Sequence, residues 1–179
     1  TTGSENVSVG TYALDANTTG ANNTAVGYQA LTTNTTAGDS TAVGFNALAT
    51  NAAAANTAVG KSAMAANTTG PANVAVGFGA LDAQTGEGYC TAIGYEALTA
   101  SNASYNTAVG YRSLDSVSSG ESNTAAGLSS GDAITTGANN TVIGKGAAST
   151  LTTGGANTCI GKDADVSATG ASKQITIGV

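Results

Sequence analysis

The chain contains no histidine and no tryptophan, and only 9% of its 179 residues are charged. Without an imidazole, Ser-His-Asp triads, His-ligated metals and imidazole acid-base catalysis are excluded. The five basic residues are scattered, and the formal net charge is −6. No basic stripe exists for a nucleic-acid backbone, so nucleic acid is not an expected partner.

Long hydrophobic runs are also missing. The longest apolar run is far too short to span a bilayer, and the first residues lack the charged-then-apolar pattern of a signal peptide. We therefore expect no membrane insertion by this segment. Gly, Asn and Thr are abundant and are poor helix formers, whereas Val, Ile and Thr favour strands, which predicts an all-β chain.

The chain is instead dominated by a repeat that is centred on a glycine. A version of NTAVGYQAL (residues 23–31) recurs at intervals of 16 or 17 residues along the whole chain. Such a period indicates one small unit stacked many times, and a disordered tract would not keep Val or Ile before nearly every phased glycine. The phased glycines are Gly10, Gly27, Gly44, Gly60, Gly77, Gly94, Gly110, Gly127, Gly144, Gly161 and Gly178.

The repeat predicts a repetitive parallel β-solenoid, a β-roll or β-helix of about eleven coils of 16–17 residues. Seventeen residues at ~3.3 Å each can wrap only a small cross-section, and coils spaced by ~4.8 Å would make a rod roughly 50 Å long. Residues 1–179 form one repeat domain. The terminal coils resemble the middle ones, so we expect a segment of a longer fibre or copies that stack end to end.

Strand alternation assigns residues to two faces. Val or Ile directly before the glycine, and Thr three before it, share one face, which we predict to be buried. The alanine two before the glycine then faces outward, and we predict that this small, flat stripe is a subunit interface. The alternative is that small residues keep a neighbouring loop close. The stripe comprises Ala25, Ala42, Ala58, Ala75, Ala92, Ala108 and Ala125.

The other rows of the repeat have structural interpretations. Asn four before the glycine is expected to hydrogen-bond from coil to coil, and the glycine itself to have positive φ at a corner. Aromatic residues after the glycine, such as Tyr28 and Phe45, and leucines three further on, such as Leu31, are expected to fill the core and to stack from coil to coil. The alternative is that the aromatic residues line a ligand groove. Cys90 and Cys159 lie four coils apart, so we expect them to be unpaired and buried.

Acidic residues recur five after the glycine. Of Asp15, Asp82, Asp115 and Asp132, only Asp115 and Asp132 are in adjacent coils, where they could share a weakly held cation. The alternative is that they are solvated loop acids. No catalytic residue, cofactor or other metal ligand is expected.

The motifs NTAVGYQAL (23–31), NTAVG (56–60) and YNTAVGYRSL (105–114) resemble the repeats of phage tail-fibre-like proteins. They are also similar to the NSVAIG-type repeat of trimeric autotransporter adhesin heads. The resemblance covers essentially all 179 residues. It implies a left-handed β-roll, a homotrimer, attachment to cells or surfaces with surface glycans as possible ligands, and an extracellular location on a virion tail or bacterial surface.

The leading hypothesis is therefore a non-enzymatic structural fibre or adhesin protein. One alternative is a self-stacking extracellular filament subunit. Another is an ice-binding or surface-binding β-solenoid, against which we set the prediction that the threonine row points inward. An enzyme is not expected, because no nucleophile-base or metal arrangement interrupts the repeat.

Overall fold

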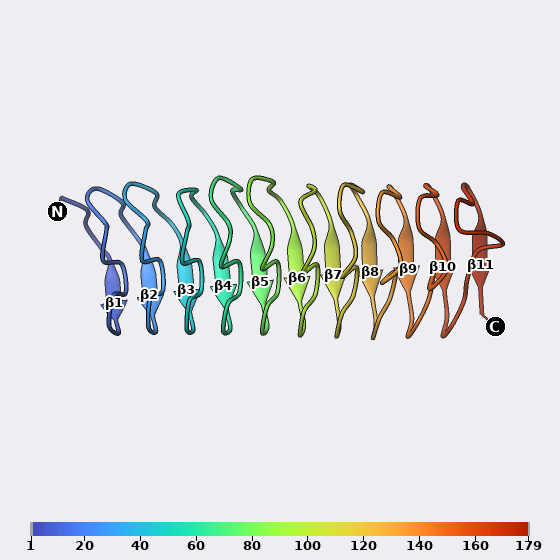
Figure 1. Cartoon of the computed structure of the whole chain (residues 1–179), viewed down its shortest axis with the longest axis horizontal. Helices are drawn as coiled ribbons and strands as arrows, with labels where there is room; N and C mark the ends of the chain where they lie inside the picture. The colour runs from blue at the N-terminus through green and yellow to red at the C-terminus, as the bar shows by residue number, and fades with distance from the viewer. Residues whose placement is uncertain (1, 179) are drawn as a thin grey trace.

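The computed structural model describes residues 2–178, and these form an all-β solenoid of about ten turns without a helix. Eleven three-residue strands pair in parallel, each beside its neighbours in the chain (Figure 1). The predicted parallel β-solenoid is confirmed. The strands are β1 (Val7–Val9), β2 (Thr24–Val26), β3 (Thr41–Val43), β4 (Thr57–Val59), β5 (Val74–Val76), β6 (Thr91–Ile93), β7 (Thr107–Val109), β8 (Thr124–Ala126), β9 (Thr141–Ile143), β10 (Thr158–Ile160) and β11 (Ile175–Ile177).

The strand register follows the repeat. Ala25 pairs with Ala42, and Ala42 pairs with Ala58 although the intervening coil is one residue shorter. The missing residue falls in the turn between Asn51 and Asn56, outside the strands. Each position of the repeat therefore becomes a row of equivalent residues along the rod.

Each strand ends at a corner that requires glycine. The φ angle of the phased glycines lies between +128° and +141° in ten copies and is +79° at Gly178, which confirms the predicted positive φ. A Cβ atom on Gly27 would also lie only 2.5 Å from the carbonyl oxygen of Gly44 in the next coil. Backbone conformation and close stacking both exclude a side chain here.

A second corner uses residues that rarely adopt positive φ. Leu31, Leu48 and Leu81 have φ of +52°, +50° and +53°. A left-handed conformation costs roughly 1–2 kcal/mol for a residue with a Cβ. Bonds between coils hold it in place, such as the N–H of Leu31 donating to the carbonyl oxygen of Ala47 at 3.1 Å. In this conformation the leucine side chain is fully buried in the core.

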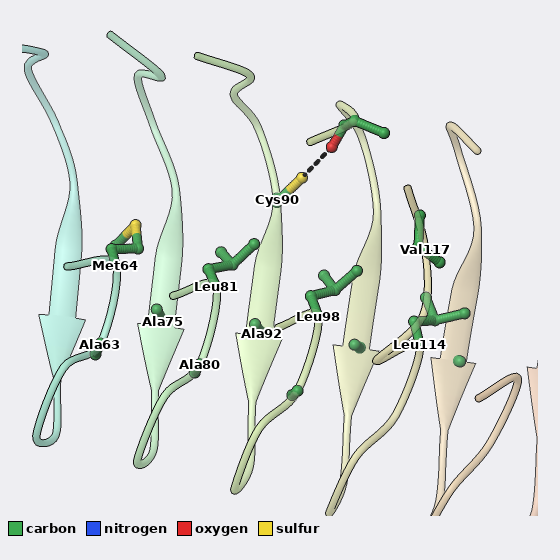
Figure 2. Close-up of a cluster of buried hydrophobic side chains, with 14 of the residues drawn as sticks. Ala63, Met64, Ala75, Ala80, Leu81, Cys90, Ala92, Leu98, Leu114 and Val117 are labelled. Atoms are coloured by element: carbon green, nitrogen blue, oxygen red, sulfur yellow. Dashed lines mark hydrogen bonds between the residues drawn. The ribbon is translucent and has the colours of Figure 1, made fainter. Parts of the chain in front are cut away.

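The core is a narrow layer between the sheet and the chain segment that returns beside it. Met64, Leu81, Leu98 and Leu114 form one row on that segment (Figure 2). Strand alanines such as Ala75 lie in the same buried cluster. The predicted leucine row is therefore confirmed as core.

The prediction of which strand face is buried is wrong. The side chains of Val59 and Ile93, directly before their glycines, are 37% and 41% exposed. The threonine row shares this outer side, because residues two apart on a strand point the same way. The small residue faces inward opposite leucine, and the branched residue at the inward alanine position of β9, Val142, is buried in a coil where Ala148 replaces the leucine.

The alanine stripe is consequently not a surface that a second chain could cover. All seven alanines are 0% exposed within a single chain, which overturns their predicted role as a subunit interface. The alternative reading, that small residues keep a neighbouring segment of the same chain close, describes their environment. They are Ala25, Ala42, Ala58, Ala75, Ala92, Ala108 and Ala125.

Buried asparagines join successive coils. The Oδ1 atom of Asn106 accepts the backbone N–H of Asn123 at 2.9 Å, and the Nδ2 atom of Asn123 donates to the carbonyl oxygen of Gly137 at 2.8 Å. Asn123 in turn accepts the N–H of Asn140 at 3.0 Å. The predicted amide ladder is confirmed, and each amide pairs backbone groups that would otherwise be buried without partners.

The thin core predicts a strong dependence on side-chain volume. Ala75→Leu should destabilise the chain by about 1–3 kcal/mol, because the larger side chain has no space beside the leucine row. Val74→Leu, on the outer side of the same strand, should change stability by less than about 0.5 kcal/mol. Urea unfolding followed by circular dichroism would measure both, and a larger loss for Val74→Leu would contradict this assignment of faces.

The corner geometry predicts a contrast between two glycines. Gly60→Ala should destabilise by about 1–3 kcal/mol or more, since φ is +137° and the new methyl would overlap Gly77. Gly86→Ala is the matched control, because the nearest atom to its new methyl is the Thr69 hydroxyl at 3.3 Å. Thermal melts of the two variants should differ clearly, and equal melting temperatures would contradict the stacking argument.

Candidate interaction surface

The outward residues of the strands form one flat, regular surface, here called the outer sheet face. It consists of the first and third residues of β1 to β11, and Val, Ile and Thr occupy all of these positions except Ala126. None is Asp, Glu, Lys or Arg. In a chain of net charge −6, the charges are therefore confined to the turns and this face is neutral. Its residues are exposed or partly exposed, and a long uncharged stripe rich in β-branched residues is a candidate interaction site.

An aromatic row borders the outer sheet face on the side of the phased glycines. The rings of Phe78, Tyr95 and Tyr111 stack with centroids 5.1 and 5.3 Å apart and planes within 11°. Phe78 and Tyr95 are 42% and 44% exposed, so the expected coil-to-coil stacking is present but the expected core location is wrong. The row comprises Tyr28, Phe45, Phe78, Tyr95 and Tyr111.

Lys61 takes the place of an aromatic residue within this row. Its Nζ atom lies 5.7 Å from the ring centroid of Phe45 and 5.6 Å from that of Phe78. The ammonium group thus bridges the two aromatic stacks by cation-π contacts. The side chain keeps the row continuous without a ring of its own.

Sequence reasoning missed a second aromatic group. Tyr89 and Tyr105 stand five residues before their glycines, and their rings stack at 5.5 Å with an interplanar angle of 10°. They are 58% and 57% exposed. They could have been recognised in the sequence by their position, because no other coil has an aromatic residue five before its glycine.

Of the two candidate cation ligands, Asp115 and Asp132, the first forms an ion pair with an arginine. The Oδ2 atom of Asp115 lies 2.7 Å from Nε of Arg112, which supplies the positive charge that a shared cation would have provided. Partial burial, followed by the charge of Asp115, raises the pKa of Asp132. No group of three or more potential metal ligands occurs within residues 2–178.

Both cysteines are buried and unpaired in the described chain, as predicted. The thiol of Cys90 donates to the carbonyl oxygen of Ala103 at 3.1 Å. Burial raises the pKa of both thiols, and the charge of Asp165 adds to the effect at Cys159. The reactive thiolate is therefore disfavoured at both positions.

No pocket opens anywhere on residues 2–178. The same residues include no helix with the length and apolarity to cross a membrane. No protein-family model, curated protein or solved structure matches this chain. The outer sheet face and the exposed aromatic groups are thus the candidate functional features, and both are open surfaces.

The raised pKa of Asp132 predicts how stability depends on pH. The stability contributed by the protonated carboxyl is fully present below its ordinary value of 3.8 and is lost as pH rises through the raised pKa. Asp132→Asn mimics the neutral form, so at pH 7 it should raise the melting temperature by about 2 °C. The gain should vanish below pH 3.8.

The control is Asp15→Asn, at the same place in the repeat but exposed and without an acid in the next coil. Melting curves of the three proteins across pH 3 to 8 would check the prediction. A gain at Asp132 that persisted unchanged in acid would show that charge burial is not its cause.

Proposed function

We propose that this chain is a non-enzymatic structural fibre or adhesin protein, a rigid β-solenoid rod that assembles as a homotrimer and mediates attachment. The proposal includes a left-handed coil and an extracellular location on a virion tail or bacterial surface. The resemblance of its repeats to tail fibres and adhesin heads supports these finer points. The observation that carries the proposal is the outer sheet face.

The outer sheet face has the properties of an interface between copies. It is neutral in an acidic chain, so copies can meet there without bringing like charges into direct contact. Exposed branched residues such as Val59 and Ile93 would leave water on association. Association would also cover a long row of β-branched residues that would otherwise be an aggregation liability.

The size of the face suits an assembly. Eleven strands spaced by ~4.8 Å extend over about 48 Å, and three residues span about 10 Å, giving on the order of 500 Å² per chain. The aromatic row at the border adds to this area. Standard interfaces bury about 800 Å² per partner, so the face and its border approach that class. Three rods that each present one flat face can enclose a common axis, which is the arrangement proposed here.

Charge placed on the outer sheet face tests the proposal. The unmodified chain should elute with a light-scattering mass of three times 17.0 kDa. Val59→Glu combined with Ile93→Glu would bring like charges together wherever copies meet, and the mass should fall to that of one chain while β content is retained. A monomeric unmodified chain at micromolar concentration would refute the assembly.

The matched control places the same two charges elsewhere. Thr36→Glu combined with Thr69→Glu changes exposed residues of the turns outside the strands. This variant should remain trimeric. If it dissociates as readily as the outer-face variant, general charge repulsion rather than a specific interface explains the effect.

A second candidate function is binding to ice or another crystal surface. The argument against it was an inward threonine row, but threonines such as Thr57 and Thr91 lie on the outer sheet face beside Val59 and Ile93. Hydroxyl and methyl groups at regular spacing on a flat surface can match a lattice. A covered face cannot also bind ice, so the two functions are distinguishable.

A thermal-hysteresis assay separates them. A monomer that shows thermal hysteresis, lost on Thr57→Lys with Thr91→Lys, would favour the second candidate. A trimer without thermal hysteresis would favour the fibre. Both measurements use the same purified chain.

A further inference from the structure

Tyr89 and Tyr105 are a local departure from an otherwise regular array. At their position in the repeat, the coils on either side carry Ala72 and Ser122. They are more exposed than any ring of the aromatic row. Most coils of a repeat protein present similar surfaces, so residues that break the pattern are candidates for a local recognition site.

The pair is held rigidly at the surface. The N–H of Tyr89 donates to the carbonyl oxygen of Pro71 at 3.1 Å, and the N–H of Tyr105 donates to that of Gly88 at 3.4 Å. The two rings support each other by near-parallel stacking. An aromatic contact that is ordered in advance loses little conformational entropy when a ligand binds.

Among the aromatic contacts of the described residues, Tyr89 and Tyr105 stack only with each other, and both residues are more than half exposed. Small residues, Ala72 on one side and Ser122 on the other, stand where the next rings of a continuous stack would be. In the aromatic row, by contrast, Tyr95 stacks with a ring on each side, and Lys61 lies over the rings of Phe45 and Phe78. Each tyrosine of the pair therefore has one ring face that no other ring covers.

Polar groups lie in the same two turns. The Ser104 hydroxyl donates to the Oε2 atom of Glu87 at 2.9 Å, which links the coils that carry the tyrosines. Glu121 follows in the next turn, and residues 85–90, 101–106 and 118–123 contain no Lys or Arg. The surroundings of the pair are thus acidic and rich in hydrogen-bond acceptors.

We propose that Tyr89 and Tyr105, with Glu87 and Ser104, form a shallow binding ledge for a neutral saccharide unit of a surface glycan. The C–H-rich face of a pyranose ring packs on an open tyrosine face, and its hydroxyls donate to the carboxylate. Like-charge repulsion by Glu87 and Glu121 disfavours acidic sugars. The inference rests on the proposed attachment function and names its ligand class.

Saturation-transfer NMR on the whole chain tests the ledge. The neutral probes are cellohexaose, chitohexaose and mannohexaose, and the acidic probe is sialyllactose. At least one neutral probe should bind and sialyllactose should not. Tyr89→Ala combined with Tyr105→Ala should lower the affinity for the neutral probe that binds by about tenfold or more.

Two matched variants isolate the role of the ring faces. Tyr28→Ala combined with Tyr111→Ala removes two rings of the aromatic row and should leave binding unchanged. Tyr89→Phe combined with Tyr105→Phe keeps the ring faces and should retain most of the binding. Circular dichroism melts confirm that each variant is folded.

The outcomes are decisive for the ledge and separable from the proposed assembly. Three results would overturn the inference. They are absence of binding by all neutral probes, binding of sialyllactose, and an affinity of the Tyr89 and Tyr105 alanine variant equal to that of the unmodified chain. A trimer that binds no saccharide refutes the ledge alone. A monomer that binds a neutral probe through the tyrosines refutes the trimer and supports the ledge.

Discussion

The structure depends on the in-register stacking of equivalent positions from one coil to the next. Only a repeat of nearly constant length lets Asn106 accept the backbone N–H of Asn123, and Asn123 that of Asn140. The same register places the phased glycines in direct contact, where a Cβ atom would overlap the next coil. Each coil thereby pairs buried backbone groups of its neighbour, which helps a chain with so small an interior to fold.

Stacking also determines what the surface looks like. Because the sheet and the returning segment are close, the interior combines alanine from the strand with leucine from the returning segment in most coils, as at Ala75 and Leu81. The β-branched residues that favour strands are left on the outside, at positions such as Val59 and Ile93. A narrow solenoid of this kind has its broad apolar surface outside, and this surface is the basis of the proposed assembly.

The regular surface lies on the strands, whereas the irregular tyrosine pair lies in the turns. The outer sheet face is nearly uniform, which suits a repetitive contact between copies. Tyr89 and Tyr105 interrupt the pattern on a turn, with Glu87 and Ser104 beside them. Turns tolerate such changes because the strands and the buried amides maintain the register, so a scaffold of identical coils can carry a local recognition site.

The sequence alone determined the period, the parallel β-solenoid, the positive φ of glycines such as Gly27 and the hydrogen bonding of asparagines from coil to coil. Each of these follows from a residue type with one dominant physical role. Which strand face is buried was decided only by the tertiary structure, because alternation shows that Ala58 opposes Thr57 and Val59 but not which side faces the core. The positive φ of Leu31 has no signal in the sequence, since leucine adopts it only when bonds between coils impose it. The stacking of Tyr89 on Tyr105 likewise needed three dimensions, because the register across a 16-residue coil brings the two rings together.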